Sequence, residues 1–309
     1  MTGIALEAAR SRGRERGRTD RGWLPWLLPP LVLLLGFFGY PLALVAGQSL
    51  TAKSGEVGLS VWADVLGSAE FRDALGQTVA LALGATAGCV LLGTFLALVI
   101  AFVPFPGARA LSRLVDTVLA FPSFLITLAF TFLYGSAGIL GAGGFLYSPW
   151  GVLLAEITFY TPFVMRPALA AFGQVPAAQL DVAASLGAKP GRVLWRVILP
   201  EALPSLASGA CLTMLLAMNE FGIVLFLGAK DVATLPTLIY GKAIVTFDFP
   251  AACVVAMVNV ALSLALYGFY RWASEARRAY NRAAARRADR VRVSRKTQKG
   301  GPRAAVDAA

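Results

Sequence analysis

The stretch LDVAASLGAKPGRVLWRVILP (residues 180–200) interrupts a chain whose other long segments are largely apolar. Pro176, just before it, is suited to start a helix, and Gly187 is suited to end that helix in a left-handed conformation. Pro190 then starts a second short helix, which is predicted to end before Pro200. Neither helix is long enough to cross a bilayer, so we predict a pair of short helices outside the hydrocarbon region.

Composition places the rest of the chain in a membrane. The 309 residues are 57% hydrophobic and 15% charged, which would leave a soluble globule with too much apolar surface. Six apolar runs are each close to or above the roughly 20 residues that a helix needs to cross the hydrocarbon layer. They cover residues 23–48, 75–103, 111–134, 150–172, 206–227 and 250–270. We therefore predict an all-α membrane protein with six transmembrane helices.

The distribution of positive charge predicts the orientation, because Lys and Arg residues that flank spans stay on the cytoplasmic side. With the N-terminus inside, 23 of the 28 Lys and Arg residues lie in cytoplasmic segments. The outer loops carry Lys53, Arg72, Lys230 and Lys242, and Arg166 lies within a span. Both termini are therefore predicted to be cytoplasmic.

The same pattern divides the chain into three parts. A basic N-terminal tail (1–22) precedes a six-helix transmembrane domain (23–272), whose cytoplasmic loop covers residues 173–204, and a basic C-terminal tail (273–309) follows. The first half of that tail is predicted to continue the last span as a charged helix, and its end is predicted to be disordered. Inner-leaflet lipid phosphates explain the net charge of +11 better than nucleic acid does, because the excess lies in tails next to spans.

Several other features are weaker signals. The basic N-terminus does not indicate a cleavable signal, because the apolar run after it is too long, so the first span is predicted to be an uncleaved anchor. Residues 61–75 predict a short amphipathic helix at the membrane surface. Gly84 and Gly88 predict close helix packing within the subunit. Cysteines 89, 211 and 253 lie in apolar spans without disulfide or metal spacing, so no metal site is predicted.

The spacing in residues 181–200 resembles the cytoplasmic EAA loop of ATP-binding-cassette (ABC) importer permeases. The family form is EAA, three residues, Gly, nine residues, Ile, one residue and Leu-Pro. Here the matching positions are Asp181, Val182 and Ala183 (EAA), Gly187 (Gly), Val197 (Ile), and Leu199 and Pro200 (Leu-Pro). The small side chains around Ala184 would let a partner surface approach the helix closely. The resemblance implies that the loop docks into a groove of an ATPase subunit and transmits its movement to the membrane helices.

Residues 102–140, 151–171 and 219–236 are similar to the permeases of 2-aminoethylphosphonate importers. This resemblance implies a type I permease fold in a bacterial inner membrane and a phosphonate delivered by an extracytoplasmic binding protein. It also implies a pair of ATPase subunits and a second permease, which is a distinct paralogue. Related permeases for spermidine or putrescine, sulfate or iron share the architecture and are alternatives. The chain has no GxxxxGK[ST] motif, so ATP is expected on the partner subunit, with no cofactor and no enzymatic activity on this chain.

Charged residues within spans are costly and usually face protein or a water-filled path. Asp116 is three residues from Arg113, which predicts an ion pair on one helix face. Arg166 can reach lipid phosphates, contact the translocated anion or pair within the bundle.

Three further polar residues are candidates for the substrate pathway. Glu156 is either exposed at the membrane interface or part of that pathway. Asn219 and Glu220 either pair with another helix, including Arg166, or bind an ammonium group of the substrate.

Two rival functions remain at this stage. A channel or secondary carrier would work without an ATPase, but no inverted repeat of broken spans is evident. A membrane enzyme has less support, because the sequence contains no histidine and no nucleophile motif or metal cluster.

Overall fold

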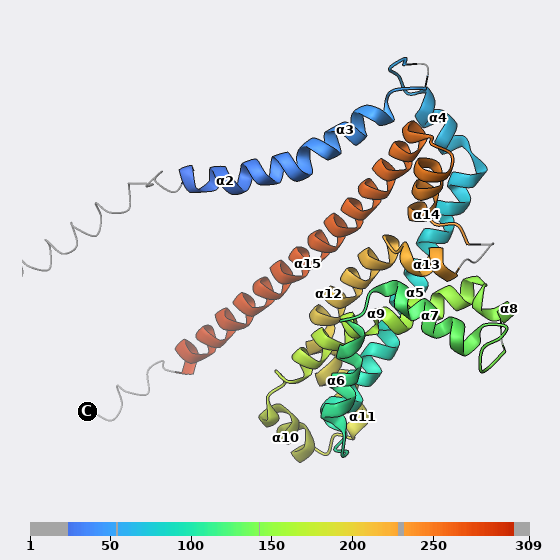
Figure 1. Cartoon of the computed structure of the whole chain (residues 1–309). Helices are drawn as coiled ribbons and strands as arrows, with labels where there is room; N and C mark the ends of the chain where they lie inside the picture. The colour runs from blue at the N-terminus through green and yellow to red at the C-terminus, as the bar shows by residue number, and fades with distance from the viewer. Residues whose placement is uncertain (1–23, 54, 142, 228–231, 300–309) are drawn as a thin grey trace, which may run out of the picture.

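The regular elements of the computed structural model are helices (Figure 1), and it describes residues 24–299 apart from 54, 142 and 228–231. The α-helices are α2 (Leu24–Leu34), α3 (Tyr40–Ser49), α4 (Ser60–Gly67), α5 (Ala69–Phe102), α6 (Ala108–Val118), α7 (Ser123–Tyr134), α8 (Gly143–Leu146), α9 (Pro149–Phe172), α10 (Ala177–Ser185), α11 (Pro190–Val193), α12 (Leu199–Met218), α13 (Gly222–Leu227), α14 (Leu235–Tyr240) and α15 (Phe249–Lys299). Three π-helical segments are η3 (Leu35–Gly39), η4 (Leu194–Ile198) and η5 (Gly241–Val245). The predicted helical class is confirmed for the described residues.

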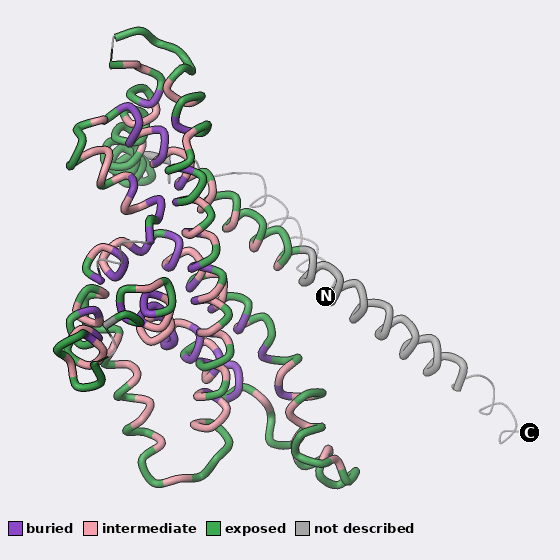
Figure 2. Tube along the Cα trace, turned by 90° about the vertical axis from the view of Figure 1, so that its right-hand side faces the viewer, coloured by how far each residue is buried: buried purple, intermediate pink, exposed green. Residues whose placement is uncertain are grey.

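The largest of three core clusters lies where α5, α9 and α12 pack against one another. In Figure 2 the buried segments, drawn in purple, lie within the packed body of the molecule, and the protruding loops are mostly exposed. Gly84 and Gly88 of α5 face α9, and a Cβ on Gly88 would clash with the side chain of Ile157. The predicted role of these glycines in helix packing within the subunit is therefore confirmed.

Gly209 gives a direct test of this packing. A Cβ on Gly209 would lie 3.0 Å from Phe163 O and 3.1 Å from Val164 Cα, which are backbone atoms of α9. We expect Gly209→Leu to lower the free energy of unfolding by about 1–3 kcal/mol, because the two helices must separate. The melting temperature of the detergent-purified protein measures this change. Gly76→Leu is the matched control, since nothing lies within 4 Å of a Cβ there. Equal melting temperatures for the two variants would contradict the packing.

The predicted count of six spans is not confirmed. Within the described residues, four helical stretches are long and apolar enough to cross a membrane, namely Trp26–Ser49, Ala69–Phe102, Pro190–Met218 and Phe249–Glu275. The 24-residue α9, which corresponds to the predicted fourth span, is not among them. Half of its residues are buried against protein, so it needs a less apolar surface than a lipid-facing helix and can carry Glu156 and Arg166.

The predicted third span, 111–134, is not one straight helix. It consists of α6 and α7, which meet at an angle of 108° and would provide a fifth span if the pair is counted as one. Pro122 lies in the break with ψ of 142°, an extended conformation that ends α6 and starts α7 in a new direction. A run of apolar residues alone does not reveal this bend.

The predicted end of the second short helix before Pro200 is wrong. The helix continues from Pro190 to Met218, and the π-helical segment η4 widens it directly before Leu199 and Pro200. The π-turn leaves room for the proline ring. The helix therefore changes its hydrogen-bond pattern at this point and continues. The predicted fifth span, 206–227, is also corrected: it breaks at residues 219–221, and the short α13 follows.

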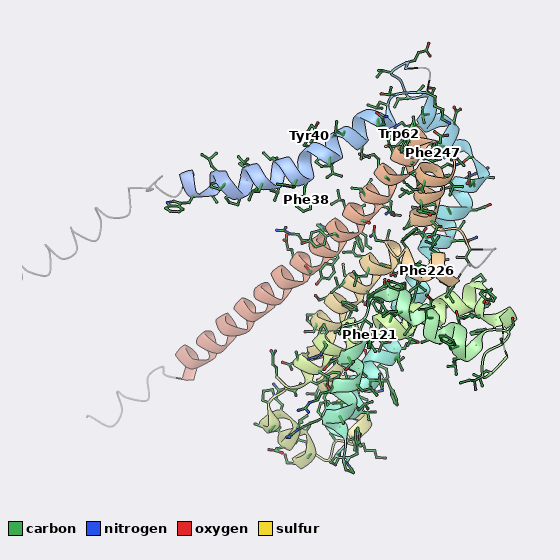
Figure 3. The ribbon with its side chains drawn as sticks, in the orientation of Figure 1. Phe38, Tyr40, Trp62, Phe121, Phe226 and Phe247 are labelled. Carbon is green, nitrogen blue, oxygen red and sulfur yellow. The ribbon has the colours of Figure 1, made fainter. Side chains whose placement is uncertain are left out.

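The outer parts of the fold agree in part with the local predictions. Helix α4 covers residues 61–67 of the segment predicted to be one amphipathic helix, but the chain is extended at Ser68 and residues 69–75 belong to α5. Helix α15 continues well beyond the last predicted span. The arm formed by α2, η3 and α3 leaves the bundle, and Phe38 and Tyr40 project from it (Figure 3). No residue in the apolar window of this arm is buried, as expected for a surface that meets lipid or another chain. Residues 1–22 and the end of the C-terminal tail lie outside the described residues.

Candidate functional site

The helix α10 ends in a Schellman motif, as its sequence predicts. Gly187 has a φ of +72°, the left-handed conformation that glycine adopts without a steric penalty. Its N–H donates to Ala184 O at 2.9 Å, and the N–H of Ala188 donates to Ala183 O at 3.0 Å. Lys189 then takes an extended conformation and Pro190 begins α11. Local signals therefore fold residues 177–200 into two short helices joined by a sharp turn. We call this segment the elbow.

One side of this elbow is attached to the bundle. Ile198 is buried, and Leu180, Val193, Leu194 and Leu199 pack against the core between α5, α9 and α12. These contacts fix the position of α10 and α11 relative to the membrane helices. The elbow is thereby connected to α9, which precedes it, and to α12, which continues from it.

Three apolar side chains of the elbow are largely exposed in the described part of the chain. The exposed fractions are 58% for Val182, 80% for Leu186 and 72% for Trp195. Asp181 and Ala184 are also exposed. Exposed apolar groups rimmed by polar residues mark interaction surfaces. In Figure 1, α10 and α11 lie at the opposite end of the bundle from α4 and α14, which matches a loop on one membrane face.

Not every residue of the EAA pattern lies on that surface. Ala183 and Val197 are half-buried, and Leu199 and Pro200 form the first turn of α12. These positions therefore connect the elbow to the membrane helices, while Asp181, Val182 and Ala184 are available to a partner.

Arg166 and Asp116 form an ion pair between α9 and α6, in which Arg166 Nε donates to Asp116 Oδ1. The predicted pair of Asp116 with Arg113 is wrong, because the two helices bring Arg166 to the carboxylate instead. Three alternatives were predicted for Arg166: contact with lipid phosphates, contact with the translocated anion, or pairing within the bundle. The structure shows the pairing within the bundle. The pair is distant in sequence, so helical spacing could not identify it.

Glu220 lies at the break between α12 and α13 and is buried, with 7% of its surface exposed. Its Oε1 accepts from Ser123 Oγ at 3.1 Å and from the backbone N–H of Ile223 at 2.9 Å, and its Oε2 accepts from the hydroxyl of Tyr160. The carboxylate thus joins the start of α7, the middle of α9 and the start of α13. It does not pair with Arg166.

Asn219, the neighbouring residue, points to a different helix. Its amide nitrogen donates to Leu215 O at 2.8 Å and to Ser263 Oγ at 3.2 Å, and its oxygen accepts from Asn259 Nδ2 at 2.9 Å. The Oδ1 atom of Asn259 is buried without a hydrogen-bond partner in the described part of the chain. Asn219 therefore links α12 to α15 through a polar cluster.

Glu156 is 1% exposed, which contradicts the interface alternative for this residue. Its Oε2 is buried and has no partner among the described residues. It lies one turn before Tyr160 on α9, so it is next to the Tyr160 and Glu220 contact. A buried acceptor without a donor is costly, which is typical of a position that a ligand or a conformational change completes.

The structure thus brings Glu156 and Glu220 together at one break and leaves Asn219 beside it, while Arg166 lies apart with Asp116. Sequence reasoning missed Tyr160, Ser123, Asn259 and Ser263, which supply the partners. The spacing of four residues between Glu156 and Tyr160 was the available signal, since such residues share a helix face. Among the described residues, no cluster of His, Cys, Asp and Glu could hold a metal ion.

Residues 89–278 match the family described as "Binding-protein-dependent transport system inner membrane component". The chain is 49% identical over 263 residues to PhnU of Salmonella typhimurium (strain LT2), a permease provisionally named for 2-aminoethylphosphonate transport; 81% of this chain and 92% of that protein are covered. It is 30% identical over 250 residues to the molybdenum transport system permease protein ModB of Mycobacterium tuberculosis, with 78% and 92% covered.

Solved structures with a similar fold come from bacterial importers. A chain of an ABC transporter that imports the acidic polysaccharide alginate matches with a TM-score of 0.69 at 21% identity, covering 83% of this chain and 96% of that one. A chain of the inward-facing MetNI methionine ABC transporter matches with a TM-score of 0.55 at 18% identity, covering 66% and 94%. At these identities the likeness concerns the fold alone.

Proposed function

The chain belongs to the family of binding-protein-dependent transport system inner membrane components, and from this premise we propose that it is the permease through which 2-aminoethylphosphonate enters the cell. As an ABC importer permease it is a multi-pass inner membrane protein and not an enzyme. The observation that supports this substrate is the 49% identity, over most of both chains, to a relative named for this solute.

Coupling to ATP is proposed to occur at the elbow. ATP binds to a pair of ATPase subunits and closes them, and the exposed residues of the elbow, including Val182, Ala184 and Leu186, move with them. The elbow is packed on the core and continuous with α12. Its movement therefore rearranges the membrane helices, and the transport path closes on one side of the membrane and opens on the other. A bias of about 5 kcal/mol is enough to move a two-state equilibrium almost completely, and differential docking of the elbow supplies it.

The substrate carries an ammonium group and a phosphonate. We place contact with the ammonium group at the break after α12, where Glu220 and Glu156 present carboxyl groups and Asn219 adds a polar neighbour. Glu156 has an oxygen without a partner in the described part of the chain, so it can accept a new hydrogen bond when the break opens. Carboxylates complement an ammonium group and repel an unaccompanied anion, which favours a zwitterion over sulfate.

The remaining partners follow from the family. An extracytoplasmic binding protein delivers the solute, and a second permease, a distinct paralogue of this chain, completes the path. Lipid covers the exposed apolar helices. The second candidate, a permease of the same type for another small solute, draws support from the 30% identity to a molybdenum transport permease.

The deciding experiment is growth on 2-aminoethylphosphonate as the sole phosphorus source. We expect a strain without this chain to stop growing and a plasmid copy to restore growth, because the proposed permease carries the solute into the cell. Growth on inorganic phosphate is the control and should not change. Unchanged growth of the deletion strain on 2-aminoethylphosphonate would refute the substrate. Flux through the purified chain alone in liposomes would instead support an autonomous channel or carrier.

A further inference from the structure

Helix α6 is loosely packed. None of its residues is buried, and it packs mainly against α5 and α9. An apolar pocket of about 340 Å³, open to the surface, lies between these three helices, and its lining includes Leu92, Leu96, Leu114, Val115, Thr158 and Thr161. Phe121, which follows α6 and is labelled in Figure 3, is 52% exposed. Apolar packing therefore holds α6 only through half-buried side chains such as Val115.

Covalent continuity does not fix α6 in place. The angle of 108° between α6 and α7 means that the two helices do not move as one rod. At the other end, Gly107 precedes α6 with a φ of +102°. A helix between two such points needs another contact if it is to follow the motion of its neighbours.

The Asp116 and Arg166 ion pair supplies that contact. It is the only salt bridge between α6 and α9 among the described residues. In the single chain, 55% of the Arg166 side chain and 21% of the Asp116 side chain are exposed, so the pair lies at the edge of the bundle. Next to lipid or another apolar chain, water competes little for either group, and an unpaired charge there is unfavourable.

Arg166 is also on the helix that leads into the elbow. Helix α9 ends at Phe172, and α10 begins at Ala177. We propose that the Asp116–Arg166 pair positions α6 on α9, so that movement of the elbow is passed through α9 to α6 and to the bent span. Arg166 is then a positioning residue for transport and does not bind the phosphonate. This inference rests on the proposed transport function.

The test uses the complete importer in liposomes, with its ATPase and binding protein, and measures solute taken up per ATP hydrolysed. We expect Asp116→Asn and Arg166→Gln each to lower this ratio ~10-fold, the size of a typical coupling between sites. The exchange of charges, Asp116→Arg with Arg166→Asp, should restore most of the ratio. Arg166→Lys, which keeps the charge, should lose less than Arg166→Gln.

The charge exchange separates positioning from substrate binding. If Arg166 contacts the phosphonate, the exchanged variant transports no better than the single variants, and the inference is overturned. It is also overturned if the single variants keep the wild-type ratio, or if the exchanged variant fails to accumulate in the membrane. If only the single variants fail to accumulate, transport by the exchanged variant decides the question. A wild-type importer that does not carry 2-aminoethylphosphonate would refute the substrate alone, and the ratio would then be measured with the solute that it carries.

Discussion

Ala184→Arg is expected to abolish uptake while the chain still inserts into the membrane. Ala184 is exposed on α10, on a different side of the helix from Val182 and Leu186. A long charged side chain there would hold the ATPase surface away from the helix. Disruption of an interface at a residue that the partner contacts costs about 2–3 kcal/mol. A loss of this size corresponds to ~30–150-fold in the docked population.

Two measurements check this expectation. Uptake of labelled 2-aminoethylphosphonate by whole cells should fall to the level of the deletion strain, and the ATPase subunit should no longer co-purify with the permease. Ala184→Ser is the matched control, because it keeps a small side chain and should retain both properties. Normal uptake by Ala184→Arg would contradict the coupling role of the elbow.

The elbow could be predicted from the sequence because its signals are local. Pro176 and Pro190 mark the two helix starts, and Gly187 is the residue in the left-handed conformation between them. Each acts on its immediate neighbours through φ and through a missing or redirected N–H. No distant part of the chain has to be known for this prediction.

The polar contacts within the bundle could not be predicted in the same way. Arg113 and Asp116 have the spacing of an ion pair. The Asp116 carboxylate nevertheless pairs with Arg166, which is fifty residues away from it in the sequence. The outcome depends on how α6 lies across α9, which follows from packing and from the bend at Pro122. The continuation of the helix through Pro200 has a similar origin, since tertiary contacts of Ile198 and Leu199 with the core favour a π-turn over a helix end.

The second large effect is expected at Glu220. Glu220→Ala removes the acceptor of Ser123 Oγ, the Tyr160 hydroxyl and the Ile223 N–H together. Each buried donor that loses its acceptor costs about 1–3 kcal/mol, so the break between α12 and α13 should lose its fixed geometry. We expect a clear fall in the melting temperature and no measurable uptake.

Glu220→Gln separates the structural role of this residue from its charge. The amide keeps the size of the side chain and one acceptor oxygen, so most of the melting temperature should be retained. Uptake should still fall, with a higher KM for the solute, because the amide no longer attracts the ammonium group across a medium of low dielectric constant. Tyr160→Phe is the control, since it removes one donor and leaves the carboxylate charge in place. A Glu220→Gln importer with an unchanged KM would mean that Glu220 only holds α7, α9 and α13 together, and the ammonium contact would then have to be sought at Glu156.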